Sequence, residues 1–150
     1  MNQETTELPY WIIPAFPLFF VGLWCAVCYL SAFISGWRRL AAHYAATMPT
    51  TGTPLHFRGG FVGMFSYRGV LHFAAAPDGL FVWLFAPFSL GYPRLFVPWR
   101  DLSGSLQKGW MGDWVTLTAA KEPKVRIRVR RALAEAIAAA GGGSLRISAA

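Results

Sequence analysis

Histidines, cysteines and acidic residues are the side chains that most often carry catalysis or bind metals. This chain of 150 residues has three His, two Cys and seven Asp or Glu. A nucleophile needs a Ser or Cys near a base, and a zinc site needs several well-spaced Cys or His ligands. His43, His56 and His72 have no such motif around them, and the acids are too scattered for paired acid–base work. The sequence therefore predicts no catalytic residue, no metal site and no cofactor, as in a non-enzymatic protein.

Cys25 and Cys28 form a C-x-x-C motif, which in other contexts indicates redox chemistry or metal binding. Here the motif lies within a long apolar run, with no flanking charge that would favour a thiolate. We therefore expect neither role for this pair.

Positive charge is concentrated near the C-terminus. Four cations alternate with aliphatic residues along a predicted strand, and a fifth follows it: Lys124, Arg126, Arg128, Arg130 and Arg131. Alternate positions of a strand share one face, about 6.6 Å apart. Such a stripe predicts contact with anionic lipid headgroups, at about 1 kcal/mol for each cation. The alternative is a solvated edge strand, protected by its charge from aggregation. Nucleic acid is disfavoured as a partner, because neither a recognition helix nor exposed aromatic–basic interleaving accompanies the stripe, and because the expected membrane tether argues against it.

These side chains must be positioned by a chain that is 55% hydrophobic and 14% charged, whereas an average soluble domain is about 25% charged. Residues 8–37 contain no charge at all. A helix needs about 20 apolar residues to cross a bilayer, and proline is tolerated in its first turn. Because the three prolines of this segment precede residue 18, we predict a transmembrane helix over residues 16–37, after a short extracytoplasmic leader at residues 1–15.

Flanking charges give this helix a direction. The leader contains Glu4 and Glu7 but no Lys or Arg, which argues against a signal peptide. Arg38 and Arg39 follow the helix directly, and positive residues stay on the cytoplasmic side. Trp37 stands where an interfacial aromatic belt is expected. The sequence thus predicts an N-terminus outside the cell and a cytoplasmic domain carrying all 14 basic residues.

Small residues recur along the predicted helix, mostly three or four positions apart: Gly22, Cys25, Cys28, Ala32 and Ser35. Small side chains let a second helix approach closely. We therefore predict a helix-packing face that would hold a protein partner or a second copy of the chain, in addition to the lipid bilayer. The alternative is that small residues are simply common in membrane helices.

Beyond the helix, the chain has the pattern of a connector followed by short strands. Residues 38–62 become rich in Thr, Pro and Gly, which predicts a stalk and linker. Residues 63–140 contain short apolar or alternating runs between turn signals, with His72 facing outward, and end in an Ala-rich helix at residues 131–140. Residues 141–150 are expected to form a flexible tail. The predicted fold class is one transmembrane helix plus a mainly antiparallel β domain, a curved sheet or small barrel, closed by a C-terminal helix.

One motif in this domain resembles a known pattern. A predicted strand ends in a Pro-Trp pair followed by an acidic and an aliphatic residue: Pro98, Trp99, Asp101 and Leu102. With arginines directly after a single span and a terminal helix, residues 36–140 are similar to a group of uncharacterised bacterial membrane proteins with a small pleckstrin-homology (PH) or GRAM-like cytoplasmic domain. The resemblance implies a location in the bacterial inner membrane and no catalytic residues. Residues 92–94 read Tyr-Pro-Arg where that pattern has a His-Pro-Pro run.

The predicted loop around residues 85–93 has large aromatic side chains, among them Phe85 and Phe88. Exposed apolar patches usually mark an interface, so we expect this loop to face the membrane or a partner. The leading interpretation is a non-enzymatic single-pass membrane protein whose domain binds lipid headgroups or protein partners. The alternatives are an accessory subunit of a larger membrane complex, or a membrane enzyme whose partner supplies the missing residues.

Overall fold

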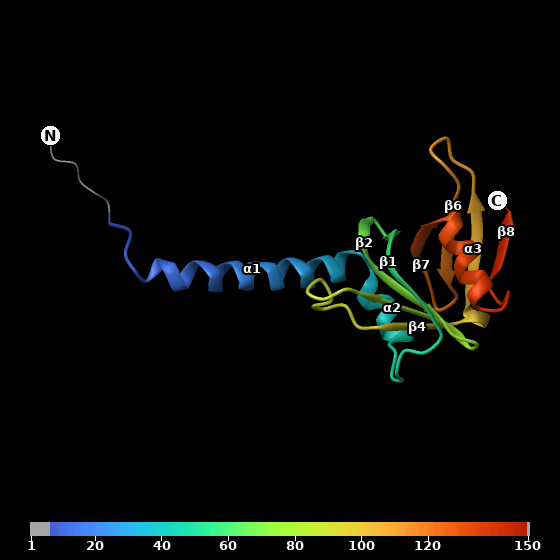
Figure 1. Ribbon diagram of the computed structural model, residues 1–150, viewed down its shortest axis with the longest axis horizontal. Helices are drawn as coiled ribbons and strands as arrows, with labels where there is room; N and C mark the ends of the chain where they lie inside the picture. The colour runs from blue at the N-terminus through green and yellow to red at the C-terminus, as the bar shows by residue number, and fades with distance from the viewer. Residues whose placement is uncertain (1–6, 150) are drawn as a thin grey trace.

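The structure, a computed structural model, describes residues 7–149 and consists of an apolar helix that stands away from a β domain (Figure 1). Residues 1–6 of the predicted leader and residue 150 of the predicted tail lie outside the described residues. Helix α1 (Ile12–Ile34) has 23 residues, and 11% of its most apolar window is buried. At 1.5 Å per residue its length is about 34 Å. By length and composition, α1 can cross a membrane.

Both ends of α1 differ from the predicted bounds. The helix begins at Ile12 rather than at residue 16. Pro14 fits in the first turn, whose N–H groups have no intrahelical partner, and Pro17 lies inside the helix, where it removes the hydrogen bond that an N–H would donate to the Ile13 carbonyl. It ends before Gly36, whose φ of +82° breaks the helical path. Trp37 is thus the first residue of a second helix, α2 (Trp37–Tyr44), which turns away from the direction of α1 (Figure 1). The expectation of an interfacial Trp37 is wrong, since this side chain is fully buried in the domain.

Eight strands form one curled, mainly antiparallel sheet that resembles half of a barrel (Figure 1). They are β1 (Thr53–Val62), β2 (Phe65–Ala75), β3 (Gly79–Leu84), β4 (Leu95–Pro98), β5 (Leu102–Gln107), β6 (Trp114–Ala119), β7 (Glu122–Arg130) and β8 (Arg146–Ala149). Their order in the sheet is β4-β3-β2-β1-β7-β6-β5-β8, with β5 and β8 paired in parallel. Helix α3 (Arg131–Ala140) follows β7 directly and matches the predicted C-terminal helix.

Helices α2 and α3 contribute to the same hydrophobic core as the sheet. Along β7, the aliphatic residues between the cations are buried and the cations are exposed, as the alternation predicts. Leu133 and Ile137 of α3, and Trp37 and Leu40 of α2, complete this core. The core therefore binds α2 to the β domain, so that the chain leaving α1 enters the domain at once.

Two segments are ordered where the sequence predicted none. Strand β1 occupies the second half of the predicted linker and pairs with both β2 and β7. Its Gly59 and Gly60 indicate a loop by propensity, but the two neighbouring strands supply hydrogen bonds that override this preference. Strand β8 lies within the predicted flexible tail and pairs with β5, next to the buried Leu145.

The Pro-Trp motif joins distant parts of this fold. The indole of Trp99, in a 3-10 turn (Trp99–Asp101), donates a hydrogen bond to the Ala76 carbonyl at 2.9 Å. The Tyr44 hydroxyl donates to Asp101 Oδ2 at 3.3 Å and accepts from the Lys121 backbone N–H at 2.9 Å. Burial raises the pKa of Tyr44, so this hydroxyl stays protonated and can donate. The motif therefore holds the end of α2 against two turns of the sheet.

Candidate functional site

The loop between β3 and β4 lies against the apolar helix (Figure 1). The ring centroids of Phe88 and Trp24 are 5.2 Å apart. Gly91, with φ of +76°, brings its backbone so close to α1 that an added Cβ would lie 3.2 Å from the Tyr29 ring. Trp24 is ten residues before the end of α1, which corresponds to about 15 Å along the helix axis. The domain thus reaches back along the apolar helix instead of beginning where it ends.

A buried aromatic cluster fixes this loop in place. The Trp37 indole donates to the Pro93 carbonyl at 2.8 Å, and its ring packs edge-on against Tyr92 at 5.3 Å. The hydroxyls of Tyr92 and Tyr67 are hydrogen-bonded at 3.0 Å. Burial, together with this hydrogen bond, raises the pKa of Tyr92 well above its usual range. The loop is therefore held by side chains of both α2 and β2.

Large apolar side chains remain exposed around the contact with α1. Phe85, Phe88 and Leu90 are 43%, 38% and 46% exposed, and Met64 in the β1–β2 turn is 91% exposed. Between the two loops and α1 lies an apolar recess of about 210 Å³, lined by residues that include Trp24, Phe65 and Phe88. The aromatic residues expected at an interface, Phe85 and Phe88, thus belong to an apolar rim beside the helix.

The domain itself covers part of the small-residue face of α1. Cys28, Ala32 and Ser35 are 8%, 0% and 2% exposed. Gly22 and Cys25, in contrast, face open space or are exposed. The spacing of small residues indicates a close approach, but it does not specify whether the approaching surface is another helix or the same chain.

Two arginines stand where α1 ends. The Arg38 guanidinium donates to the Tyr29 hydroxyl and lies 4.7 Å from the centre of its ring. Arg38 and Arg39 line, with Phe33 and Ala42, a recess of about 470 Å³ between the two helices. This recess combines positive charge with apolar walls. An anionic lipid has both complementary features, a negative headgroup and apolar chains.

The basic stripe of β7 lies on the outer face of the sheet. The edge-strand alternative is wrong, because β7 pairs with β1 on one side and with β6 on the other. The Arg128 guanidinium lies 5.8 Å from the ring centres of both Phe61 and Trp114, and that of Arg130 lies 4.7 Å from Trp114. Together with the exposed Lys124 and Arg126, these arginines form a surface of cations interleaved with aromatic rings. The expectation that no aromatic residues accompany the stripe is therefore wrong, because Phe61 and Trp114 come from the two neighbouring strands rather than from β7 itself.

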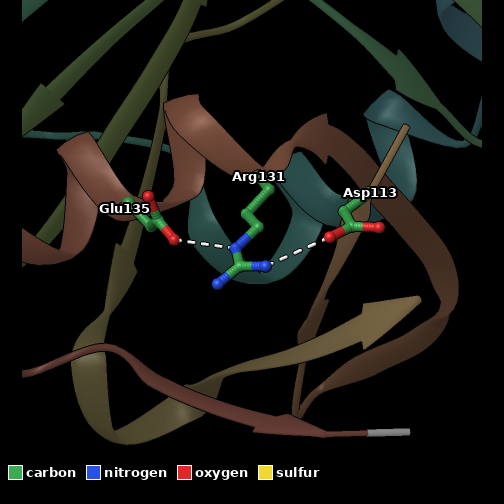
Figure 2. Close-up of polar contacts among 3 residues, drawn as sticks. All are labelled: Asp113, Arg131 and Glu135. Carbon is green, nitrogen blue, oxygen red and sulfur yellow. Dashed lines mark hydrogen bonds and ion pairs between the residues drawn. The ribbon is translucent and has the colours of Figure 1, made fainter. Parts of the chain in front are cut away.

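Arg131 has a different environment from the rest of the stripe. Figure 2 shows its guanidinium between two carboxylates, at 3.1 Å from Asp113 Oδ2 and 2.8 Å from Glu135 Oε1. The hydrogen bond that Arg131 donates to Glu135, followed by the one that it donates to Asp113, raises the pKa of Arg131. The two carboxylates balance the charge of Arg131. The ion pair with Asp113 also joins the β5–β6 connection to the start of α3.

Two histidines meet on the opposite half of the sheet. The Nδ1 atoms of His56 on β1 and His72 on β2 are 2.8 Å apart, so one ring donates a hydrogen bond and the other accepts it. As the alternation predicts, His72 lies on the face of β2 opposite the core residues Leu71 and Phe73, but it is only 5% exposed, and its ring centroid lies 5.4 Å from that of Trp83, on which it stacks. Burial, and secondarily the positive form of His56, lowers the pKa of His72. Residues 7–149 contain no cluster of three or more His, Cys, Asp or Glu that could hold a metal ion.

The sequence missed this pair because it missed β1. Without that strand, His56 falls in a linker and nothing brings it to His72, although a hairpin turning near Gly63 would bring the two residues close.

Comparison with protein-family models gives no match for this chain, and a search among curated proteins finds no match either.

Proposed function

We propose that this chain is a single-pass membrane protein whose β domain rests on the lipid surface, inserts its apolar rim beside its own helix, and binds anionic headgroups without catalysing a reaction. The contact between Phe88 and Trp24 is the observation that carries this proposal. When α1 crosses a bilayer with a hydrocarbon core of about 30 Å, a residue packed about 15 Å from the end of the helix lies within the hydrocarbon of one leaflet. The exposure of Phe88, Leu90 and Met64 suits that environment.

The charges support one orientation. Arg38 and Arg39 follow α1, and positive residues are retained on the cytoplasmic side. We infer a bacterial inner-membrane location with the N-terminus outside and the domain in the cytoplasm. A curled antiparallel sheet whose core includes a C-terminal helix supports a PH/GRAM-like identity for the domain.

A depth measurement tests the inserted loop. In a Cys25→Ser, Cys28→Ala background, Phe88→Cys is labelled with an environment-sensitive fluorophore and the full chain is reconstituted into vesicles with spin-labelled acyl chains. We expect a blue-shifted emission that the acyl-chain labels quench. The matched control is Trp110→Cys, which replaces a side chain 97% exposed in the β5–β6 turn and should report water. Equal, water-like emission at both positions would refute the proposal.

A second measurement tests the headgroup contact. Each cation near an anionic surface contributes about 1 kcal/mol, so Arg38→Gln with Arg39→Gln should lower the retention of phosphatidylglycerol by about thirtyfold. Native mass spectrometry of the full chain, with phosphatidylcholine for comparison, measures this retention. The same change at Arg126 and Arg128 tests the β7 stripe, and Lys108→Gln in the β5–β6 turn is the control. If neither arginine pair changes the retention, headgroup binding is excluded.

One feature favours an accessory subunit as a second candidate function. Trp110 and Met111 are 97% and 70% exposed at the tip of the β5–β6 turn. A cavity of about 540 Å³ beside this turn is lined by residues that include Met111, Phe61 and Trp114. Such a surface suits a protein partner better than water. A Trp110→Ser variant should then lose an assembly that survives mild-detergent size analysis in the parent.

A further inference from the structure

The histidine pair forms part of a cavity that the proposed membrane contact does not use. The cavity has a volume of about 430 Å³ and lies between the β1–β3 part of the sheet and the loop that follows β3. Nine residues line it: His56, His72, Trp83, Leu84, Phe85, Ala86, Ser89, Tyr92 and Arg94. Its volume is within the range of small-molecule sites, roughly 300–1,000 Å³.

The polar lining of this cavity favours an anion. Besides the Trp83 indole, five of the nine residues have N–H or O–H donors, three of these five can carry positive charge, and none of the nine has a carboxylate. The Arg94 guanidinium donates to Thr50 Oγ1 at 2.8 Å, which uses one of its five N–H groups. The donors come from β1, from β2 and from the loop, so they approach the cavity from different directions. A tetrahedral oxyanion, with oxygens in several directions, accepts from such a set better than a planar carboxylate does.

The remaining walls are apolar and aromatic. Trp83, Leu84, Phe85 and Ala86 form one continuous segment along the cavity. Phe85 belongs to the apolar rim described above, so the cavity is close to the surface that faces lipid in the proposed function. A ligand that fills the space must therefore combine an anionic group with an apolar body.

We propose that this cavity binds a phosphate monoester attached to an apolar body, with Arg94 and the His56–His72 pair as its phosphate ligands and Trp83 against its apolar part. A lipid of the phosphatidic-acid type and a soluble organic phosphate share this chemistry. The lipid source rests on the proposed function, whereas phosphate binding by the cavity does not, because the cavity lies within the domain.

Binding is coupled to protons. The groups around His72 that titrate or carry charge are His56 on β1 and Tyr92 and Arg94 on the loop. The hydrogen bond between the two rings requires that one Nδ1 is unprotonated. A bound dianion favours the protonated form of His72, so binding should be accompanied by the uptake of a proton.

Titration calorimetry of the full chain in a neutral detergent at pH 7.5 tests the proposal. The probes are dihexanoyl phosphatidic acid, inorganic phosphate and dihexanoyl phosphatidylcholine. We expect the phosphatidic acid to bind most tightly, and Arg94→Gln or His72→Gln to weaken it by about tenfold or more. Titrations in two buffers of different ionisation enthalpy should show proton uptake in the parent and less in His72→Gln.

The controls separate the site from the fold. Thr50→Val removes the internal partner of Arg94 but leaves its donors, and it should bind as the parent does. Inorganic phosphate that binds as tightly as the lipid, with the same loss in Arg94→Gln, would keep the phosphate ligands but overturn the part of the proposal that places an apolar body against Trp83. No binding of either phosphate, or unchanged binding in both variants, overturns the proposal. None of these outcomes depends on loop insertion, which the depth measurement tests separately.

Discussion

At the scale of single residues, glycines decide how closely α1 and the domain approach. Gly36, with φ of +82°, turns the chain from α1 into α2, and an added Cβ would lie 2.5 Å from Val125 Cγ2. Gly63, with φ of +59°, would place a Cβ 2.4 Å from the Ser35 carbonyl oxygen. Both positions need a residue without a side chain, because both the backbone conformation and the space exclude one.

Gly36→Ala should therefore be destabilising by about 2–4 kcal/mol, from the left-handed conformation and the overlap with Val125 together. Gly142→Ala is a matched control, since Gly142 also has a positive φ, of +67°, but no atom lies within 4 Å of the added Cβ. Gly142→Ala should lower the free energy of unfolding only by the cost of the left-handed conformation, about 1 kcal/mol. Chemical unfolding in mild detergent measures both, and equal losses would show that contact with Val125 is not restrictive.

His72 predicts how stability responds to pH. Its folded pKa is lowered, first by burial and then by His56, while the unfolded chain titrates near pH 6.5. The contribution of neutral His72 to the free energy of unfolding should be complete above about pH 6.5. It should fall as the pH drops toward the folded pKa, by at most about 1.4 kcal/mol per pH unit. Unfolding curves from pH 5 to 8 should show a smaller slope in His72→Gln. His43→Gln, at an exposed position in α2, should keep the parent slope; an unchanged slope in His72→Gln would contradict this prediction.

At the scale of elements, strand β8 shows how tertiary pairing orders a segment with weak local signals. Leu145 is 5% exposed, and Ile147 pairs opposite Gly104 of β5. The absence of a side chain at Gly104 leaves room there, because an added Cβ would lie 3.2 Å from Ile147 Cγ1. The C-terminal segment thus belongs to the folded domain.

Leu145→Ala should lower the free energy of unfolding by about 2–3 kcal/mol, as expected for a buried leucine. The neighbouring Arg146 is exposed, so Arg146→Ala should change it by less than about 0.5 kcal/mol. Thermal or urea unfolding measures this difference. A Leu145→Ala variant as stable as the parent would show that the tail contributes no packing.

Elements with a strong periodic pattern were predictable from the sequence. The alternation of residues 124–130 gives β7 and its buried face, and the Ala-rich run gives α3 with its observed bounds. Strand β1 was not predictable in this way, because Gly59, Gly60 and Pro54 disfavour a strand locally and only its neighbours stabilise it. Irregularities in the register of the β1–β2 hairpin also decide which residue lies beside His56, and no local pattern specifies them.

The candidate site depends on contacts that are even further apart in the sequence. The sequence identified Phe85 and Phe88 as large aromatic residues of a loop, and their role at an interface stays a prediction. Their position beside Trp24, however, results from the Trp37–Pro93 hydrogen bond and the Tyr67–Tyr92 pair, each of which joins separate elements. Sequence patterns indicate whether a surface is apolar or charged. What that surface contacts is decided by the packing of the whole domain.

At the scale of the whole molecule, α1 has two roles that divide along its length. Its N-terminal part stands free of the domain, with exposed apolar side chains (Figure 1). Its C-terminal part is part of the core, since Ala32 belongs to the same buried cluster as the strands. Helix α1 and the β domain are therefore one folding unit, and the boundary between them cannot be set at the end of the helix.

This division predicts different outcomes for two truncations. A chain that begins at Trp37 loses Cys28, Ala32 and Ser35 and uncovers Tyr92 and its neighbours, whereas a chain that begins at Val27 keeps those contacts. Buried apolar surface stabilises a fold by about 25 cal/mol per Å². Because the shorter chain uncovers such surface, it should be less stable by about 2 kcal/mol or more. It should also associate in detergent-free buffer, because the apolar surface around Tyr92 that Cys28, Ala32 and Ser35 cover would have nothing packed on it. Size-exclusion chromatography and thermal unfolding compare the two chains. If the shorter one is equally stable and monomeric, the contacts between α1 and the β domain contribute nothing to the fold of the domain.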